Sequence, residues 1–91
     1  MIGIMKPKTK VGNWTLNKFS WNTGKNIQYD NTSIRGLQLH VSKIYGDKID
    51  YYSVHVYRYA VYYKSRFEKQ FATYKEAIDF AYKYMKSHPR G

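Results

Sequence analysis

The sequence predicts an α+β domain: a three-stranded antiparallel sheet, or a four-stranded one if the region before residue 34 adds a strand, packed on one C-terminal helix. Apolar and polar residues alternate along residues 37–42 and again along 52–57, which is the period of a half-buried strand. A capping-box sequence at Thr73 then opens an amphipathic segment. Strands followed by a helix are typical of a small sheet that buries one face under that helix.

The helix is expected to begin after Thr73 and to end near Ser87. Thr73 and Glu76 have the spacing at which side chain and backbone cap each other reciprocally. Pro89 disfavours helical geometry at the residue before it, which sets the end. One face of the segment carries the apolar residues Ala77, Ile78, Ala81, Tyr84 and Met85. A helix of about four turns is unstable alone in water, so it must pack on the strands.

Two strands are expected around a hairpin turn at Gly46-Asp47. The apolar positions of 37–41 and of 52–56 must share a face, which restricts the pairing register. In either acceptable register the opposite face is polar and aromatic. Its expected members are Gln38, His40, Ser53, His55 and Tyr57.

The third strand falls within residues 59–71, which contain no Gly, Pro or Asn to mark a turn. The hairpin tip is therefore expected either near Ala60 or near Lys64-Ser65. Phe67 and Phe71 are expected to face the helix, and the outward residues are then Arg66, Glu68 and Gln70.

Residues 13–33 carry turn signals at 22–26 and 30–33, with a short strand or hairpin between them around 27–29. Trp14 and Trp21 supply apolar mass here, and their large burial energy favours core positions over base-stacking positions. We expect residues 13–91 to form one domain, because a chain of 91 residues has a single small core.

We expect residues 1–12 to form a basic N-terminal arm outside this domain. Lys6, Lys8 and Lys10 lie there, and no acidic residue precedes Asp30. Two interpretations stay open: a flexible terminus with solvated charge, or an arm that settles on phosphates when DNA is present.

The formal charge of +10 favours a polyanionic partner. Cysteine is absent, which fits a reducing compartment, and no apolar run approaches the length of a membrane span. We therefore expect a cytoplasmic protein, of the nucleoid or of a host cell, with a nuclear location also open.

The motifs of common enzyme classes are missing from the sequence. There is no phosphate-binding glycine loop and no nucleophile elbow. His40 and His55 could approach one another, but a metal site lacks a clear third ligand. A histidine acting as general base in RNA cleavage is the outlying alternative. We expect a non-enzymatic protein without cofactors or metals.

The predicted site is the open face of the sheet, since a narrow sheet can lie in the DNA major groove. This interpretation depends on a polar, cationic sheet surface that the helix leaves uncovered. Candidates for reading base edges are Arg35, Gln38, His40, His55, Tyr57, Arg66 and Gln70. Candidates for holding phosphates are Lys43, Lys48, Lys64 and Lys69, together with Lys6, Lys8 and Lys10.

A family resemblance adds to this interpretation. Ile34-Arg35-Gly36, the strand at 52–58 and the segment Phe71-Ala72-Thr73-Tyr74-Lys75-Glu76-Ala77-Ile78 resemble the Apetala or ethylene-response-factor DNA-binding domain, a module that small phage and bacterial proteins share. The resemblance covers about residues 34–85 and implies a three-stranded sheet laid in the major groove. The chain lacks the family's tryptophan in the second strand and its glycine before Phe71.

Three functions are open at this stage. Binding of duplex DNA through the sheet comes first. The second is a phage-type inhibitor or adaptor that docks on an acidic protein through a tyrosine-rich face. The third is binding of single-stranded DNA or RNA, with Trp14, Trp21 and the strand tyrosines as stacking platforms.

Overall fold

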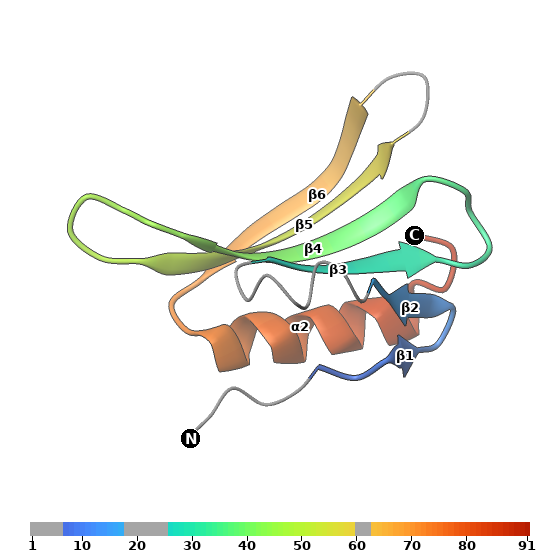
Figure 1. Cartoon of the computed structure of the whole chain (residues 1–91), viewed down its shortest axis with the longest axis horizontal. Coiled ribbons are helices and arrows are strands. Elements are labelled where there is room, and N and C mark those ends of the chain that lie inside the picture. The colour runs from blue at the N-terminus through green and yellow to red at the C-terminus, as the bar shows by residue number, and fades with distance from the viewer. Residues whose placement is uncertain (1–6, 18–25, 60–62) are drawn as a thin grey trace.

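The computed structural model describes residues 7–17, 26–59 and 63–91, and omits the side chains of Tyr59 and of residues 63–66. Within these residues the chain forms one antiparallel sheet with strand order β1-β2-β3-β4-β5-β6, and α2 lies across one face of it (Figure 1). The elements are β1 (Lys10–Val11), β2 (Trp14–Leu16), β3 (Asn26–Asn31), β4 (Leu37–Ile44), β5 (Tyr51–Tyr59), β6 (Tyr63–Phe71) and α2 (Tyr74–Ser87).

The α+β class with a C-terminal helix is confirmed, but the expected number of strands is wrong, because the sheet has six. The missed strands β1 and β2 are two and three residues long, which is too short for a period of two to stand out. β3 does alternate, with Ile27, Tyr29 and Asn31 pointing inward, but its inward set includes polar groups. A short strand was expected around 27–29, and the structure has a longer one over Asn26–Asn31.

Residues 7–12 belong to the packed domain and not to a free arm. Pro7 is buried, and Lys10–Val11 pairs with β2. The backbone N–H of Lys8 donates to the Tyr82 hydroxyl at 2.9 Å, and the Tyr29 hydroxyl donates to the Lys8 carbonyl at 2.6 Å. The expected boundary at residue 12 therefore misses a segment held by side chains from β3 and α2. Residues 1–6 lie outside the described part of the chain.

The register between β4 and β5 matches the expected alternation. Leu39 pairs with Val56 and Val41 with Val54, and all four side chains are buried. The next hairpin joins Tyr59 to Tyr63, so the alternative tip at Lys64-Ser65 is wrong, while Ala60 lies outside the described residues.

The α2 helix begins and ends where the sequence indicates. The Glu76 N–H donates to the Thr73 hydroxyl, and the Thr73 N–H donates to the Glu76 carboxylate, so the capping box is complete. Ala77, Ile78 and Ala81 are buried against the sheet. Phe67 and Phe71 face α2 as expected, with ring centroids 5.6 and 5.1 Å from that of Phe80.

The C-terminal residues close the core beside β2 and β3 (Figure 1). Trp14 is fully buried, and its indole N–H donates to the His88 carbonyl at 3.0 Å. The Asn31 amide donates to the Pro89 carbonyl at 2.9 Å, while its oxygen accepts from the N–H groups of Ser33 and Ile34. Trp14 is thus a core residue and cannot stack on a base. Trp21 lies outside the described residues.

Candidate nucleic-acid interface

The sheet face opposite α2, called here the outer face, is built from three cross-strand rows of polar side chains. Residues that pair directly across antiparallel strands point to the same face, so the register defines each row. The rows run Asp30, Gln38, Tyr57; then Gln28, His40, His55, Glu68; and then Asn26, Ser42, Ser53, Gln70. The register extends the first row through Thr15 to Lys10.

A hydrogen-bond network holds the aromatic part of this face in place. The Tyr57 hydroxyl lies 2.9 Å from both Gln38 Oε1 and His40 Nε2. On the other side of the imidazole, Asn26 Nδ2 lies 3.3 Å from His40 Nδ1, and Asn26 Oδ1 accepts from the Ser42 hydroxyl at 3.0 Å. The network joins β3, β4 and β5, and it fixes the orientation of the Tyr57 and His40 rings.

His40 is placed to be a neutral imidazole. Burial lowers the pKa of His40 below its ordinary value of 6.5, the nearby His55 lowers it further, and Asp30 partly opposes the shift. The neutral Nε2–H tautomer accepts from Asn26 at Nδ1 and donates toward Gln38, which satisfies the contacts around it. The surroundings of His40 therefore favour the uncharged form of its ring.

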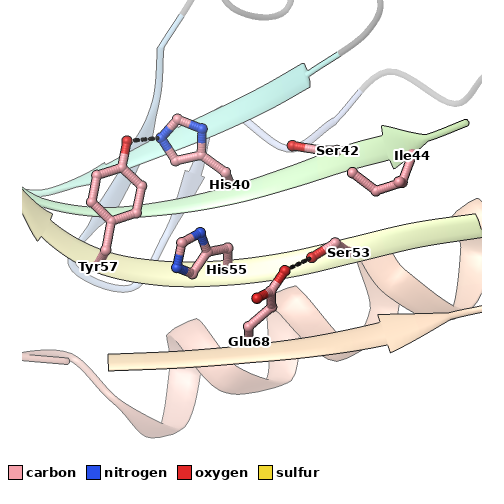
Figure 2. A pocket seen from close by; sticks show the side chains of 7 residues that line it. All are labelled: His40, Ser42, Ile44, Ser53, His55, Tyr57 and Glu68. Atoms are coloured by element: carbon pink, nitrogen blue, oxygen red, sulfur yellow. Dashed lines mark hydrogen bonds between the residues drawn. The ribbon is translucent and has the colours of Figure 1, made fainter. Parts of the chain in front are cut away.

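A pocket of about 260 Å³ opens beside this network (Figure 2). His55 and Tyr57 line one end, with ring centroids 5.1 Å apart and planes tilted by 41°. Next to His55, the Ser53 hydroxyl donates to Glu68 Oε2 at 3.0 Å, and Figure 2 shows these two side chains turned toward each other. The complete lining is His40, Ser42, Ile44, Ser53, His55, Tyr57 and Glu68.

The structure brings together five of the predicted base-reading residues. Gln38, His40, His55 and Tyr57 share the outer face as expected, and the register adds Gln70 opposite Ser53. Arg35 is exposed in the loop between β3 and β4, where its carbonyl accepts from the Arg58 side chain at 3.4 Å. It therefore lies beyond the end of β4 and not within the rows.

Arg66 does not take its expected place beside Tyr57 in the ladder. Val56 pairs with Phe67 but Tyr57 pairs with Ser65, so the register shifts by one residue at this point and Arg66 falls within the shift. The side chains of Arg66 and Lys64 lie outside the described part of the structure, as does all of Lys6.

The described lysines do not gather on the outer face. Lys69 pairs with the buried Val54 and therefore belongs to the helix side, where its Nζ lies 5.1 Å from the Phe80 ring centroid. Lys43 follows the buried Val41 by two residues on β4 and therefore belongs to the helix side as well. Its Nζ lies 3.7 Å from Asp50 Oδ2. Lys48 is exposed in the β4–β5 turn, and Lys8 lies over the Tyr82 ring of α2.

The expectation of a cationic sheet surface is therefore wrong for the described side chains. The three rows contain two carboxylates, Asp30 and Glu68, and Lys10 is the cation that the register places at the end of the first row. The outer face is polar and aromatic at its centre, Lys10 lies at the end of its first row, and Arg35 and Lys48 are exposed in the loops before and after β4.

Sequence reasoning missed the contribution of β3 to this face. Asn26, Gln28 and Asp30 alternate with the inward residues of that strand, and that alternation was the available signal. Glu68 was expected to point outward but was not considered part of the site. Its role depends on a contact with Ser53 across the strands, which no local pattern reveals.

Among the described residues, no group of three or more His, Asp or Glu side chains could hold a metal ion. In the same part of the chain, no helix has both the length and the apolar character needed to cross a membrane. Comparison with family models, curated proteins and solved structures returns no match for this chain.

Proposed function

We propose that the protein binds nucleic acid without enzymatic activity, and that a single strand lies across the outer face. The observation that carries this proposal is a sheet face that no other described element covers, whose centre presents His40, His55 and Tyr57, while α2 occupies the opposite face. Aromatic side chains on an open sheet are suited to stacking on unpaired bases.

The width of the sheet favours a single strand over duplex DNA. Neighbouring strands lie about 4.8 Å apart, so the four long strands β3 to β6 span about 14 Å before side chains are added. The major groove is about 12 Å wide and admits a two-stranded ribbon. The three-stranded docking that the family resemblance implies is therefore hard to reconcile with this sheet. A flexible single strand meets no such limit.

The charge distribution supports the same arrangement. Bases would stack on the aromatic centre, and phosphates would lie toward Lys10 at the end of the first row and toward the exposed loop residues Arg35 and Lys48. The net charge of +10 supplies long-range attraction for a polyanion. Affinity should therefore fall steeply as salt rises.

The test compares binding of fluorescent single-stranded and duplex oligonucleotides at low and moderate salt. The variant Tyr57→Leu removes a ring from the outer face, and Tyr45→Leu is its control because Tyr45 is exposed in the β4–β5 turn. Loss of a stacked base costs about 1–3 kcal/mol, so Tyr57→Leu should weaken single-strand binding by roughly 5- to 150-fold. Tyr45→Leu should change it little.

Tighter binding of the duplex at both salt concentrations would favour the duplex interpretation instead. Absence of binding to both forms would overturn the proposal. An equal loss in the two tyrosine variants would show that the outer face is not the contact surface.

A further inference from the structure

Resting on the proposed function, the geometry points to a more specific role for the outer-face pocket: we infer that it binds a single guanine base of the strand. The pocket volume of about 260 Å³ lies just below the range of roughly 300–1,000 Å³ that is usual for drug-sized ligands. A single planar base suits this size, whereas a folded nucleotide chain does not.

One end of the pocket offers aromatic surface. His55 and Tyr57 are half-buried and line the pocket, and their mutual tilt of 41° means that they do not stack flat on each other. Tyr57 is held by its contacts with Gln38 and His40, so little side-chain freedom remains to be lost when a base stacks there.

The neighbouring part of the pocket offers the carboxylate of Glu68, which accepts hydrogen bonds and does not donate them when ionised. Glu68 pairs directly with His55 across the strands, so the carboxylate lies beside the aromatic end. Ser53 donates to Oε2 of Glu68 at 3.0 Å, which restrains the orientation of the carboxylate. The Ser53 bond occupies one of about four lone-pair sites on the carboxylate, so each oxygen keeps a site that can meet one of two adjacent N–H donors.

Guanine is the base whose Watson–Crick edge presents two adjacent donors, N1–H and the N2 amine. Cytosine, adenine and uracil each place an acceptor beside their donor, and that acceptor would face the carboxylate. A site built to accept hydrogen bonds discriminates strongly against a ligand that lacks the matching donor. The expected preference for guanine is roughly 5- to 150-fold, as for other well-formed bidentate pairs.

The pocket also accounts for a carboxylate on the proposed binding face of a protein with a charge of +10. A carboxylate repels phosphates, so Glu68 would weaken binding if the backbone ran over it. If Glu68 meets a base edge instead, its charge strengthens recognition through charge-assisted hydrogen bonds.

The experiment measures binding of short uridine oligonucleotides, as RNA and in their deoxyribose form, that carry one central guanine, adenine or cytosine or none. Two further probes replace the guanine by inosine, which lacks the N2 amine, or by 7-deazaguanine, which keeps the Watson–Crick edge. The unaltered protein should bind the guanine and 7-deazaguanine oligonucleotides equally and more tightly than the others. It should bind the inosine oligonucleotide more weakly than the guanine one.

The variant Glu68→Gln should lose the guanine preference and keep binding to the uridine oligonucleotide. Its control is Asp79→Asn, which removes a carboxylate of equal charge from the exposed face of α2. Equal affinity for all central bases, with binding intact, would overturn the guanine pocket and leave the proposed function standing. If no oligonucleotide binds, both the guanine pocket and the proposed function are overturned. The inosine comparison uses the unaltered protein, so it does not depend on the folding of a variant.

Discussion

At the scale of single residues, the surroundings of His40 favour the uncharged form of its imidazole. Its imidazole contacts Tyr57, Gln38 and Asn26, and burial is the main cause of its lowered pKa, followed by the charge of His55. A proton added at Nδ1 would place two donors against each other at the Asn26 amide. The network is therefore built for the neutral ring.

The lowered pKa of His40 makes the stability of the fold depend on pH. Because the folded-state pKa of His40 lies below its ordinary value of 6.5, the unfolded state binds more protons in acid. The contribution of His40 to the free energy of unfolding should be constant above that value and decrease as the pH falls below it. NMR titration of the His40 ring should give a midpoint below 6.5.

The variant His40→Gln should remove that part of the pH dependence. His88→Gln serves as the control, because His88 is exposed after the end of α2. A His40 midpoint at or above 6.5 would contradict this description of the outer face.

At the scale of elements, the buried hydroxyls of Tyr29 and Tyr74 differ in whether they have a hydrogen-bond partner. Tyr29 on β3 is fully buried and donates to the Lys8 carbonyl, which holds the N-terminal segment onto the sheet. The Tyr74 hydroxyl is buried at the start of α2 and has no hydrogen-bond partner within the described residues. Burial raises the pKa of Tyr29 above its ordinary value and that of Tyr74 to about 12.

Substituting each tyrosine by phenylalanine should separate these roles. Tyr29→Phe should lower the free energy of unfolding by about 0.5–1.5 kcal/mol, because a made hydrogen bond is lost. Tyr74→Phe should be neutral or stabilising, because it removes a polar group whose burial is not compensated. Urea denaturation of the two variants measures both effects, and the reverse order would show that the contacts are wrongly assigned.

The elements differ in how far the sequence could predict them. β4, β5 and α2 were predictable, because long alternating or amphipathic runs and a capping box leave little choice. β1 and β2 were not, since strands of two and three residues are specified by their partners in space. Lys69 was misplaced for a related reason: its Nζ lies 5.5 and 5.1 Å from the ring centroids of Phe71 and Phe80 on the helix side, a cation–π contact that depends on packing between elements.

At the scale of the whole molecule, the extra strands change the interpretation of the site. Gln38, His40, His55 and Tyr57 follow from the alternation of two strands, whereas Asn26, Gln28 and Asp30 join them through the pairing of β3 with β4. The wider sheet favours an unpaired strand as the partner. Composition alone could not indicate that Lys8, Lys43 and Lys69 belong to the helix side of the sheet.

The most direct test of the proposed interface is NMR mapping of the unaltered protein during titration with a short single-stranded oligonucleotide. The outer-face model predicts that the side-chain signals of His40, His55 and Tyr57 move together and saturate with the bound strand. The exposed α2 residues Lys75 and Lys83, on the opposite side of the sheet, should change little. Saturating shifts confined to α2, with the outer-face signals unmoved, would contradict the model.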